Sequence, residues 1–128
     1  MDAPRILVVD DDRSTATAVA RVLTGQGYAV DMASDGPSAL ALVKKNAYSM
    51  AIVDFQMPGM NGVEFFREAR ETSPDLMGVC LTAYANINTV FPAIEAGIER
   101  VLSKPLDARE LLRLTRELTA TENGPSAV

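Results

Sequence analysis

The segment AIVDFQMPGMNG, residues 51–62, runs from an apolar stretch into a single acid and then directly into a loop. Its first three residues form the kind of continuous apolar run found in a strand that is covered on both faces. Asp54 ends this run, and the Pro58-Gly59 pair that follows is typical of a turn. The segment therefore predicts a buried strand with a carboxylate at its carboxyl end, where open parallel sheets bind their ligands.

Strand-like runs of the same kind recur along the chain. They lie at residues 5–9, 29–33, 50–53, 77–82 and 100–103. Most are rich in Val, Ile, Leu and Met, with little alternation of polar and apolar residues. The run at 29–33 alternates more and predicts an edge strand.

Segments with the apolar spacing of helices separate these runs. They cover residues 14–24, 37–46, 62–72, 86–96 and 108–121. Strand and helix thus alternate five times. This order predicts an α/β fold: a doubly wound, five-stranded parallel sheet with helices on both faces and right-handed crossovers. We expect one domain over residues 1–121 and a disordered tail over residues 122–128.

Local signals add detail to three of the helices. Asp107 is a candidate N-cap for the last helix, with Glu110 three residues on. Pro92 falls near the middle of the segment 86–96 and predicts a weaker helix there. The first helix is expected to bury a face made by Ala18, Val19, Val22 and Leu23.

Composition excludes several kinds of chemistry. The chain has 128 residues, one cysteine (Cys80) and no histidine, so an intrachain disulfide is excluded, and so is a histidine of this chain as nucleophile, base or metal ligand. The net charge of −5 argues against direct binding of nucleic acid by charge. No run is long enough to span a membrane and none resembles a signal peptide, so we expect a cytoplasmic protein with no membrane contact.

Polar residues gather where the predicted strands end. The first strand is followed by Asp10, Asp11 and Asp12, and the third, fourth and fifth lead to Asp54, Thr82 and Lys104. All of them fall at one edge of the expected sheet. Carboxylates so close together stay ionised only if a positive charge joins them. Hard oxygen ligands favour Mg²⁺, with Mn²⁺ as an alternative, and the lysine adds a second positive charge. Such a site can stabilise a phosphoryl group transferred to Asp54.

Four motifs together resemble one known family. ILVVDDD, IVDFQMPGMNG, CLTA and SKPLD, each at a strand end, resemble the receiver domain of bacterial two-component response regulators over roughly residues 4–120. The resemblance implies a flavodoxin-like (βα)5 fold with strand order 2-1-3-4-5. It also implies that the Lys104-Pro105 peptide bond is cis.

The same resemblance assigns a role to each residue of the site. Asp54 corresponds to the phosphoacceptor, Thr82 to the hydroxyl that moves toward the phosphoryl group, and Lys104 to the lysine that pairs with it. Asp10 and Asp11 correspond to the acids that hold Mg²⁺ together with Asp54 and the backbone carbonyl of Gln56. Asp12 is left to cap the following helix.

These roles imply a signalling function. A sensor histidine kinase or phosphotransfer protein supplies the phosphoryl group, and the domain assists its own phosphorylation and dephosphorylation without turning over an external substrate. Phosphorylation is expected to switch a surface made by the fourth helix, the fifth strand and the fifth helix. That surface would bind a target protein or form a homodimer.

The sequence departs from the family at one position of the switch. Receiver domains often carry an aromatic residue three positions before the lysine, and here that residue is Val101. Tyr84, two residues after Thr82, is expected at the rim of the site.

Two other functions fit part of the pattern. The Asp10-x-Asp12 spacing, with Thr82 and Lys104, resembles a small phosphatase of the haloacid-dehalogenase type, but that reading leaves Asp54 without a role. A receiver-like interaction module that is never phosphorylated would agree with Val101, but not with the complete set of acids, hydroxyl and lysine.

Overall fold

The computed structural model describes residues 4–122 as five strands and five helices in strict alternation. The strands are β1 (Arg5–Val9), β2 (Ala29–Ala33), β3 (Met50–Asp54), β4 (Met77–Thr82) and β5 (Arg100–Ser103). The helices are α1 (Arg13–Thr24), α2 (Gly36–Lys45), α3 (Gly62–Thr72), α4 (Ile87–Glu95) and α5 (Ala108–Glu122). Residues 123–128, which belong to the predicted disordered tail, lie outside the described residues.

The strands form one parallel sheet in the order β2-β1-β3-β4-β5. The predicted fold class and strand order are therefore confirmed, and β2 is an edge strand as predicted. The central strands β1, β3 and β4 are buried almost throughout because helices cover both of their faces. This cover explains why their sequences read as continuous apolar runs.

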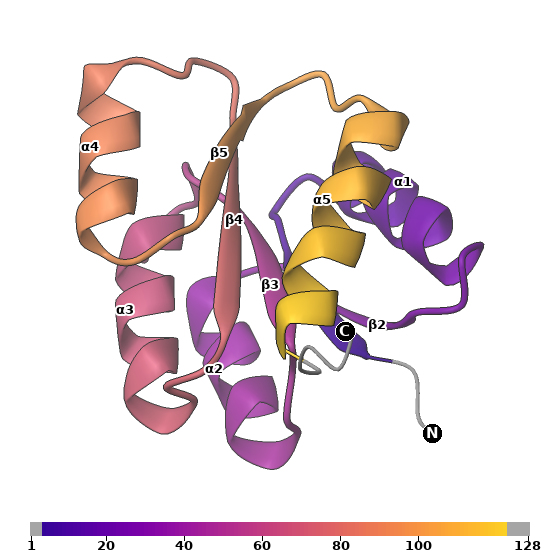
Figure 1. The fold of residues 1–128 in the computed structure, drawn as a ribbon. Coiled ribbons are helices and arrows are strands. Elements are labelled where there is room, and N and C mark those ends of the chain that lie inside the picture. The colour runs from indigo at the N-terminus through magenta and orange to yellow at the C-terminus, as the bar shows by residue number, and fades with distance from the viewer. Residues whose placement is uncertain (1–3, 123–128) are drawn as a thin grey trace.

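Two hydrophobic cores lie on opposite faces of the sheet. On one face of the sheet, α2, α3 and α4 contribute Val43, Phe65, Phe66 and Ala93 to a core. These side chains pack against the strand side chains that point to the same face. On the other face, α1 and α5 contribute a second set of buried side chains, which includes Leu23 and leucines of α5. Figure 1 shows the two helical layers, with α2, α3 and α4 on the left and α1 and α5 on the right.

Each helix begins at a polar side chain that accepts a hydrogen bond from a backbone N–H of its first turn. These side chains are Asp12, Asp35, Asn61, Asn86 and Asp107. Such caps satisfy donors that have no partner within the helix. The predicted caps at Asp12 and Asp107 are confirmed. The loops that follow β4 and β5 lie together at the top of Figure 1, at the carboxyl edge of the sheet.

The first helix faces the core with different residues from those predicted. Val19 and Leu23 are buried as expected and Val22 is half-buried, but Ala18 is exposed and Ala16 is buried instead. Ala18 comes two residues after Ala16, which places it on the opposite side of the helix. The prediction for Ala18 was wrong because an alanine leaves too weak an apolar signal to fix the helix face.

Cys80 lies in the middle of β4 and is fully buried. Burial, with a smaller contribution from the charge of Asp54, raises the pKa of its thiol to about 12. None of the helices within residues 4–122 is both long and apolar enough to cross a membrane.

A glycine at the start of α3 allows a close backbone approach. A Cβ built on Gly62 would lie 2.4 Å from the carbonyl oxygen of Asp54, whereas one on Gly36, at the start of α2, would lie 2.5 Å from the flexible side chain of Met60. Gly62→Ala should therefore cost about 2 kcal/mol of unfolding free energy, because backbone overlap forces a shift at the site. Gly36→Ala is the comparison variant and should cost less, because its Cβ would meet only side-chain atoms of Met60, including Cβ at 2.9 Å, and the loop that carries Met60 must shift only slightly. Equal losses in urea unfolding would contradict this account.

Candidate functional site

Three carboxylates converge at the carboxyl edge of the sheet. Asp10 and Asp11 follow β1, and Asp54 is the last residue of β3. Because Val9 pairs with Val53 in the parallel ladder, the acids that follow them lie side by side. One carboxylate oxygen from each acid lies within 4.8 Å of the others. Asp10 and Asp54 are buried, whereas Asp11 is exposed.

Lys104 joins two of these acids. Its Nζ lies 3.2 Å from Oδ1 of Asp54 and 3.3 Å from Oδ2 of Asp10. The lysine follows β5, and its backbone N–H donates to the carbonyl of Thr82 at 2.8 Å, which fixes its position relative to β4. The Lys104-Pro105 peptide bond is cis, as the family resemblance implied.

The charges at this edge are not balanced by the protein alone. Burial raises the pKa of Asp54 to about 6, and the neighbouring charge of Asp10 acts in the same direction while Lys104 opposes it. The burial of Lys104 acts to lower its pKa, but Asp10 and Asp54 outweigh this effect and hold that pKa above its usual value. Three carboxylates thus face one ammonium group within the described residues.

Asp10 has a buried oxygen whose hydrogen bonding is incomplete among the described residues. Its Oδ1 accepts a hydrogen bond from the backbone N–H of Asp12 at 2.8 Å. Its Oδ2 is buried and accepts no hydrogen bond of suitable geometry from the described residues, although the Lys104 ammonium lies nearby. An ionised oxygen without a full set of donors is costly to bury, so the acid cluster suits a bound cation.

Asp12 points away from this cluster. Its carboxylate accepts hydrogen bonds from the backbone N–H of Ser14 and from the hydroxyl of Thr15, both at 3.0 Å. Hydrogen bonds from Thr15 and Ser14 lower the pKa of Asp12 below its usual value. Asp12 therefore acts as the cap of α1 and not as a member of the acid cluster.

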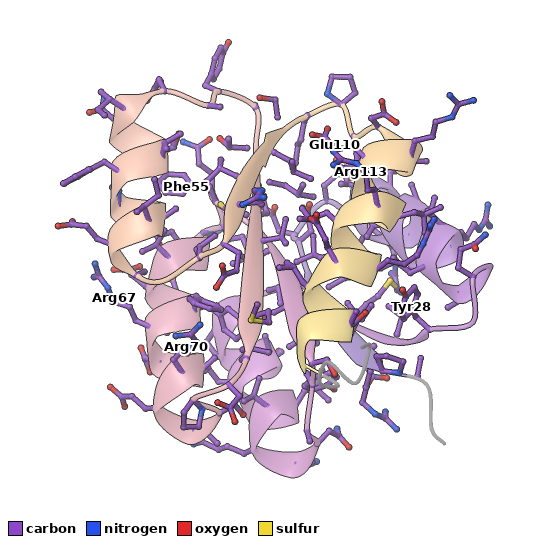
Figure 2. All side chains as sticks on the ribbon, in the orientation of Figure 1. Tyr28, Phe55, Arg67, Arg70, Glu110 and Arg113 are labelled. Atoms are coloured by element: carbon purple, nitrogen blue, oxygen red, sulfur yellow. The ribbon has the colours of Figure 1, made fainter. Side chains whose placement is uncertain are left out.

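Thr82 and Gln56 lie at the rim of the site. The Thr82 side chain is buried at the end of β4, and its hydroxyl bonds to the peptide groups of Tyr84 and not to Asp54. Gln56 lies two residues beyond Asp54, and its side chain is exposed. The role of its backbone carbonyl as a metal ligand stays a prediction. A pocket of about 250 Å³ borders Gln56, Thr82, Tyr84 and the first turn of α4. Figure 2 shows Phe55, which also lines this pocket, beside α4.

One residue of this region was missed by the sequence analysis. Thr89 had no part in the predicted site, yet it is buried and its hydroxyl lies 3.0 Å from the carbonyl oxygen of Tyr84. The available signal was the pair Asn86 and Thr89, three residues apart, which forms a capping box at the start of α4.

Comparison with known proteins identifies the class to which this fold and site belong. The model of the response regulator receiver domain matches residues 6–116, and the chain belongs to this family. It is thus a phosphoacceptor domain of two-component signalling.

Individual relatives agree with this assignment. The chain is 37% identical over 126 residues to the response regulator MprA of Mycobacterium sp. (strain KMS), covering 96% of this chain and 55% of that protein. It therefore spans about half the length of the curated relatives it matches. A CheY-like receiver domain from Methanospirillum hungatei JF-1 superposes with a TM-score of 0.91 at 27% identity, covering 95% of this chain and 98% of that one.

A third relative has been solved in a modified state. The response regulator of Burkholderia pseudomallei, whose structure contains a phosphorylated aspartic acid, a calcium ion and citrate, superposes with a TM-score of 0.80 at 28% identity. The match covers 94% of this chain and 75% of that one.

The raised pKa of Asp54 predicts a stability that depends on pH. The folded-state pKa of about 6 lies above the ordinary value of 3.8, so ionised Asp54 destabilises the fold above pH 6 and the penalty vanishes as the pH falls toward 4. In metal-free buffer at about pH 7.5, Asp54→Asn should raise the free energy of unfolding by about 1–2 kcal/mol, since water at the site screens part of the effect.

Urea unfolding at several pH values measures this effect. Asp75→Asn is the matched control, because Asp75 is exposed in the turn before β4 and loses the same charge. It should change stability little. An Asp54→Asn variant that is less stable than the wild type at neutral pH would contradict the prediction.

Proposed function

We propose that Asp54 is the phosphoacceptor of this receiver domain. The observation that carries the proposal is the Lys104 ammonium group, which lies within 3.3 Å of both Asp54 and Asp10 at the edge where three carboxylates converge. A lysine held there by β5 can pair with a phosphoryl oxygen as well as with the carboxylates. Asp54 contributes the nucleophile from the end of a rigid, buried strand.

Asp10, Asp11, Asp54 and the backbone carbonyl of Gln56 would hold Mg²⁺, with Mn²⁺ as an alternative ion. The unsatisfied Oδ2 of Asp10 and the all-oxygen character of the cluster support this assignment. The structure of a relative contains both a phosphorylated aspartic acid and a divalent ion, calcium, which agrees with this assignment. When bound, the ion would neutralise charge on the transferring phosphoryl oxygens.

Three residues of this chain have separate roles in the phosphoryl transfer. A carboxylate oxygen of Asp54 attacks phosphorus, a P–O bond forms, and the P–N bond of the phosphohistidine donor breaks, with its electron pair going to the imidazole nitrogen. The ammonium group of Lys104 then pairs with the negatively charged phosphoryl oxygens. The Thr82 hydroxyl gives up its bonds to the backbone of Tyr84 and donates a hydrogen bond to a phosphoryl oxygen.

The phosphohistidine of the donor lies outside these 128 residues, which contain no histidine. A sensor histidine kinase or a phosphotransfer protein fits this requirement, and the exchange takes place in the cytoplasm. The domain assists its own phosphorylation and its own dephosphorylation, and does not turn over an external metabolite. Nucleic acid is not a partner of this acidic domain.

The output surface lies on α4, β5 and α5. The outer side of α4 exposes Ile87, Phe91 and Ile94, and Tyr84 lies just before it. Large exposed apolar residues gathered in this way are typical of protein interaction sites. Figure 2 shows Glu110 and Arg113 on the upper part of α5, so charges of both signs accompany the apolar residues on this surface. A target protein or a second copy of the chain binds here.

Phosphorylation of the isolated protein tests the function directly. Incubation with acetyl phosphate and Mg²⁺ should add one phosphoryl group, seen by intact-protein mass spectrometry, and chelation of the metal should prevent it. Asp54→Asn should abolish the addition, whereas Asp75→Asn should leave it unchanged. Modification at Asp10 instead would favour the phosphatase, and no modification even with a kinase would favour the interaction module.

The metal assignment is tested by two neighbouring acids. Asp11→Asn should weaken Mg²⁺ binding about tenfold, because the ion loses one charged ligand. Asp12→Asn removes the same charge one residue away but keeps the cap, since Asn caps helices as well as Asp does. Thermal unfolding at increasing Mg²⁺ or Mn²⁺ measures both affinities. Equal weakening by the two changes would show that general charge, not coordination, attracts the ion.

A further inference from the structure

The loop between β4 and α4 holds Thr82 in a position turned away from the acceptor. The hydroxyl of Thr82 donates to the carbonyl oxygen of Tyr84 at 3.2 Å, and the N–H of Tyr84 donates back to that hydroxyl, also at 3.2 Å. The side chain of Thr82 thus bonds to both the backbone N–H and the backbone carbonyl of Tyr84. If Thr82 turns toward a phosphoryl group, it gives up both bonds.

A second threonine bonds to the same carbonyl. The hydroxyl of Thr89, in the first turn of α4, lies 3.0 Å from the carbonyl oxygen of Tyr84 and 3.0 Å from that of Asn86. It also accepts a hydrogen bond from the N–H of Asn86 at 3.1 Å. A hydroxyl has one proton to donate, so the two carbonyls compete for it.

We propose that Thr89 is a positioning residue that couples Thr82 to the first turn of α4 through the carbonyl of Tyr84. This inference rests on the proposed function, in which Thr82 moves on phosphorylation. When Thr82 leaves, the Tyr84 carbonyl keeps only Thr89 as a side-chain donor, and the Thr89 proton moves from Asn86 to Tyr84. The first turn of α4 then differs between the two states.

This coupling connects Thr82 to the outer surface of α4, although the residue that usually makes such a connection is absent. The usual aromatic on the fifth strand is replaced by Val101, which has no hydroxyl or ring with which to report the position of Thr82. The Tyr84 carbonyl instead connects Thr82 to the helix that exposes Ile87, Phe91 and Ile94. The route is short, because Thr82 and Thr89 each make one bond to a shared acceptor.

Amide chemical shifts of residues 86–90 test the proposal. Beryllium fluoride with Mg²⁺, a stable analogue of a phosphoryl group on a carboxylate, should move these shifts in the wild type. Thr89→Val should bind the analogue at Asp54 yet lose most of the response on α4, and Thr89→Ser should restore it. Thr119→Val is the matched control, because Thr119 is also buried and bonds to a carbonyl, but on α5.

A full response of α4 in Thr89→Val would overturn the proposal. Failure of the wild type to bind the analogue or to accept a phosphoryl group would count against the proposed function instead. A second measurement, made without phosphorylation, tests the coupling through Thr89 independently of the proposed phosphoacceptor function.

That second measurement is a double-mutant cycle between Thr82→Val and Thr89→Val in the unmodified protein. Each single change removes the acceptor of one backbone N–H, that of Tyr84 or that of Asn86, and these costs cancel in the cycle. Either hydroxyl alone can still satisfy the shared carbonyl, so only the double variant leaves that carbonyl without a side-chain donor. The double variant should lower the melting temperature by about 4 °C more than the sum of the two single changes. Simple additivity would show that the carbonyl does not couple the threonines and would overturn the proposal.

Discussion

Mutual repulsion among three carboxylates at one edge of the sheet is the constraint on which the rest of the structure depends. Lys104 relieves it only in part, because its single ammonium group pairs with Asp54 and Asp10 while Asp11 has no such partner among the described contacts. The fold supports this arrangement with two hydrophobic cores that hold the strands rigidly. A site kept short of positive charge in this way suits a cation, and a bound cation would offset the repulsion between these carboxylates and an anionic phosphoryl group.

The sheet positions these groups through backbone contacts more than through side chains. The parallel register places the acids after β1 and β3 beside each other, and the Thr82 carbonyl fixes the backbone of Lys104. Gly62 brings the start of α3 against the carbonyl of Asp54. Since each anchor lies within or next to a buried strand, Asp54 and Lys104 are preorganised before any partner arrives.

Much of this organisation could be predicted from the sequence. The strands and their burial follow from apolar runs, and the acids, Thr82 and Lys104 follow from the places where those runs end. The buried face of α1 was only partly predicted, because alanines carry little pattern. Thr89 was missed for a different reason: its partner is the backbone carbonyl of Tyr84. The spacing of Asn86 and Thr89 marks the start of a helix, but it does not reveal the bond to Tyr84. Every residue has a carbonyl oxygen, and only the folded loop decides where this one lies.

The buried thiol of Cys80 gives the molecule a further property. It is the only cysteine of the chain, it lies in the central sheet, and its pKa is about 12. A thiol so placed is hidden and almost entirely protonated, so oxidants and alkylating reagents reach it only when β4 separates from its neighbours. This thiol is thereby insulated from the redox state of its surroundings. The rate at which Cys80 is labelled would instead record how often the sheet opens.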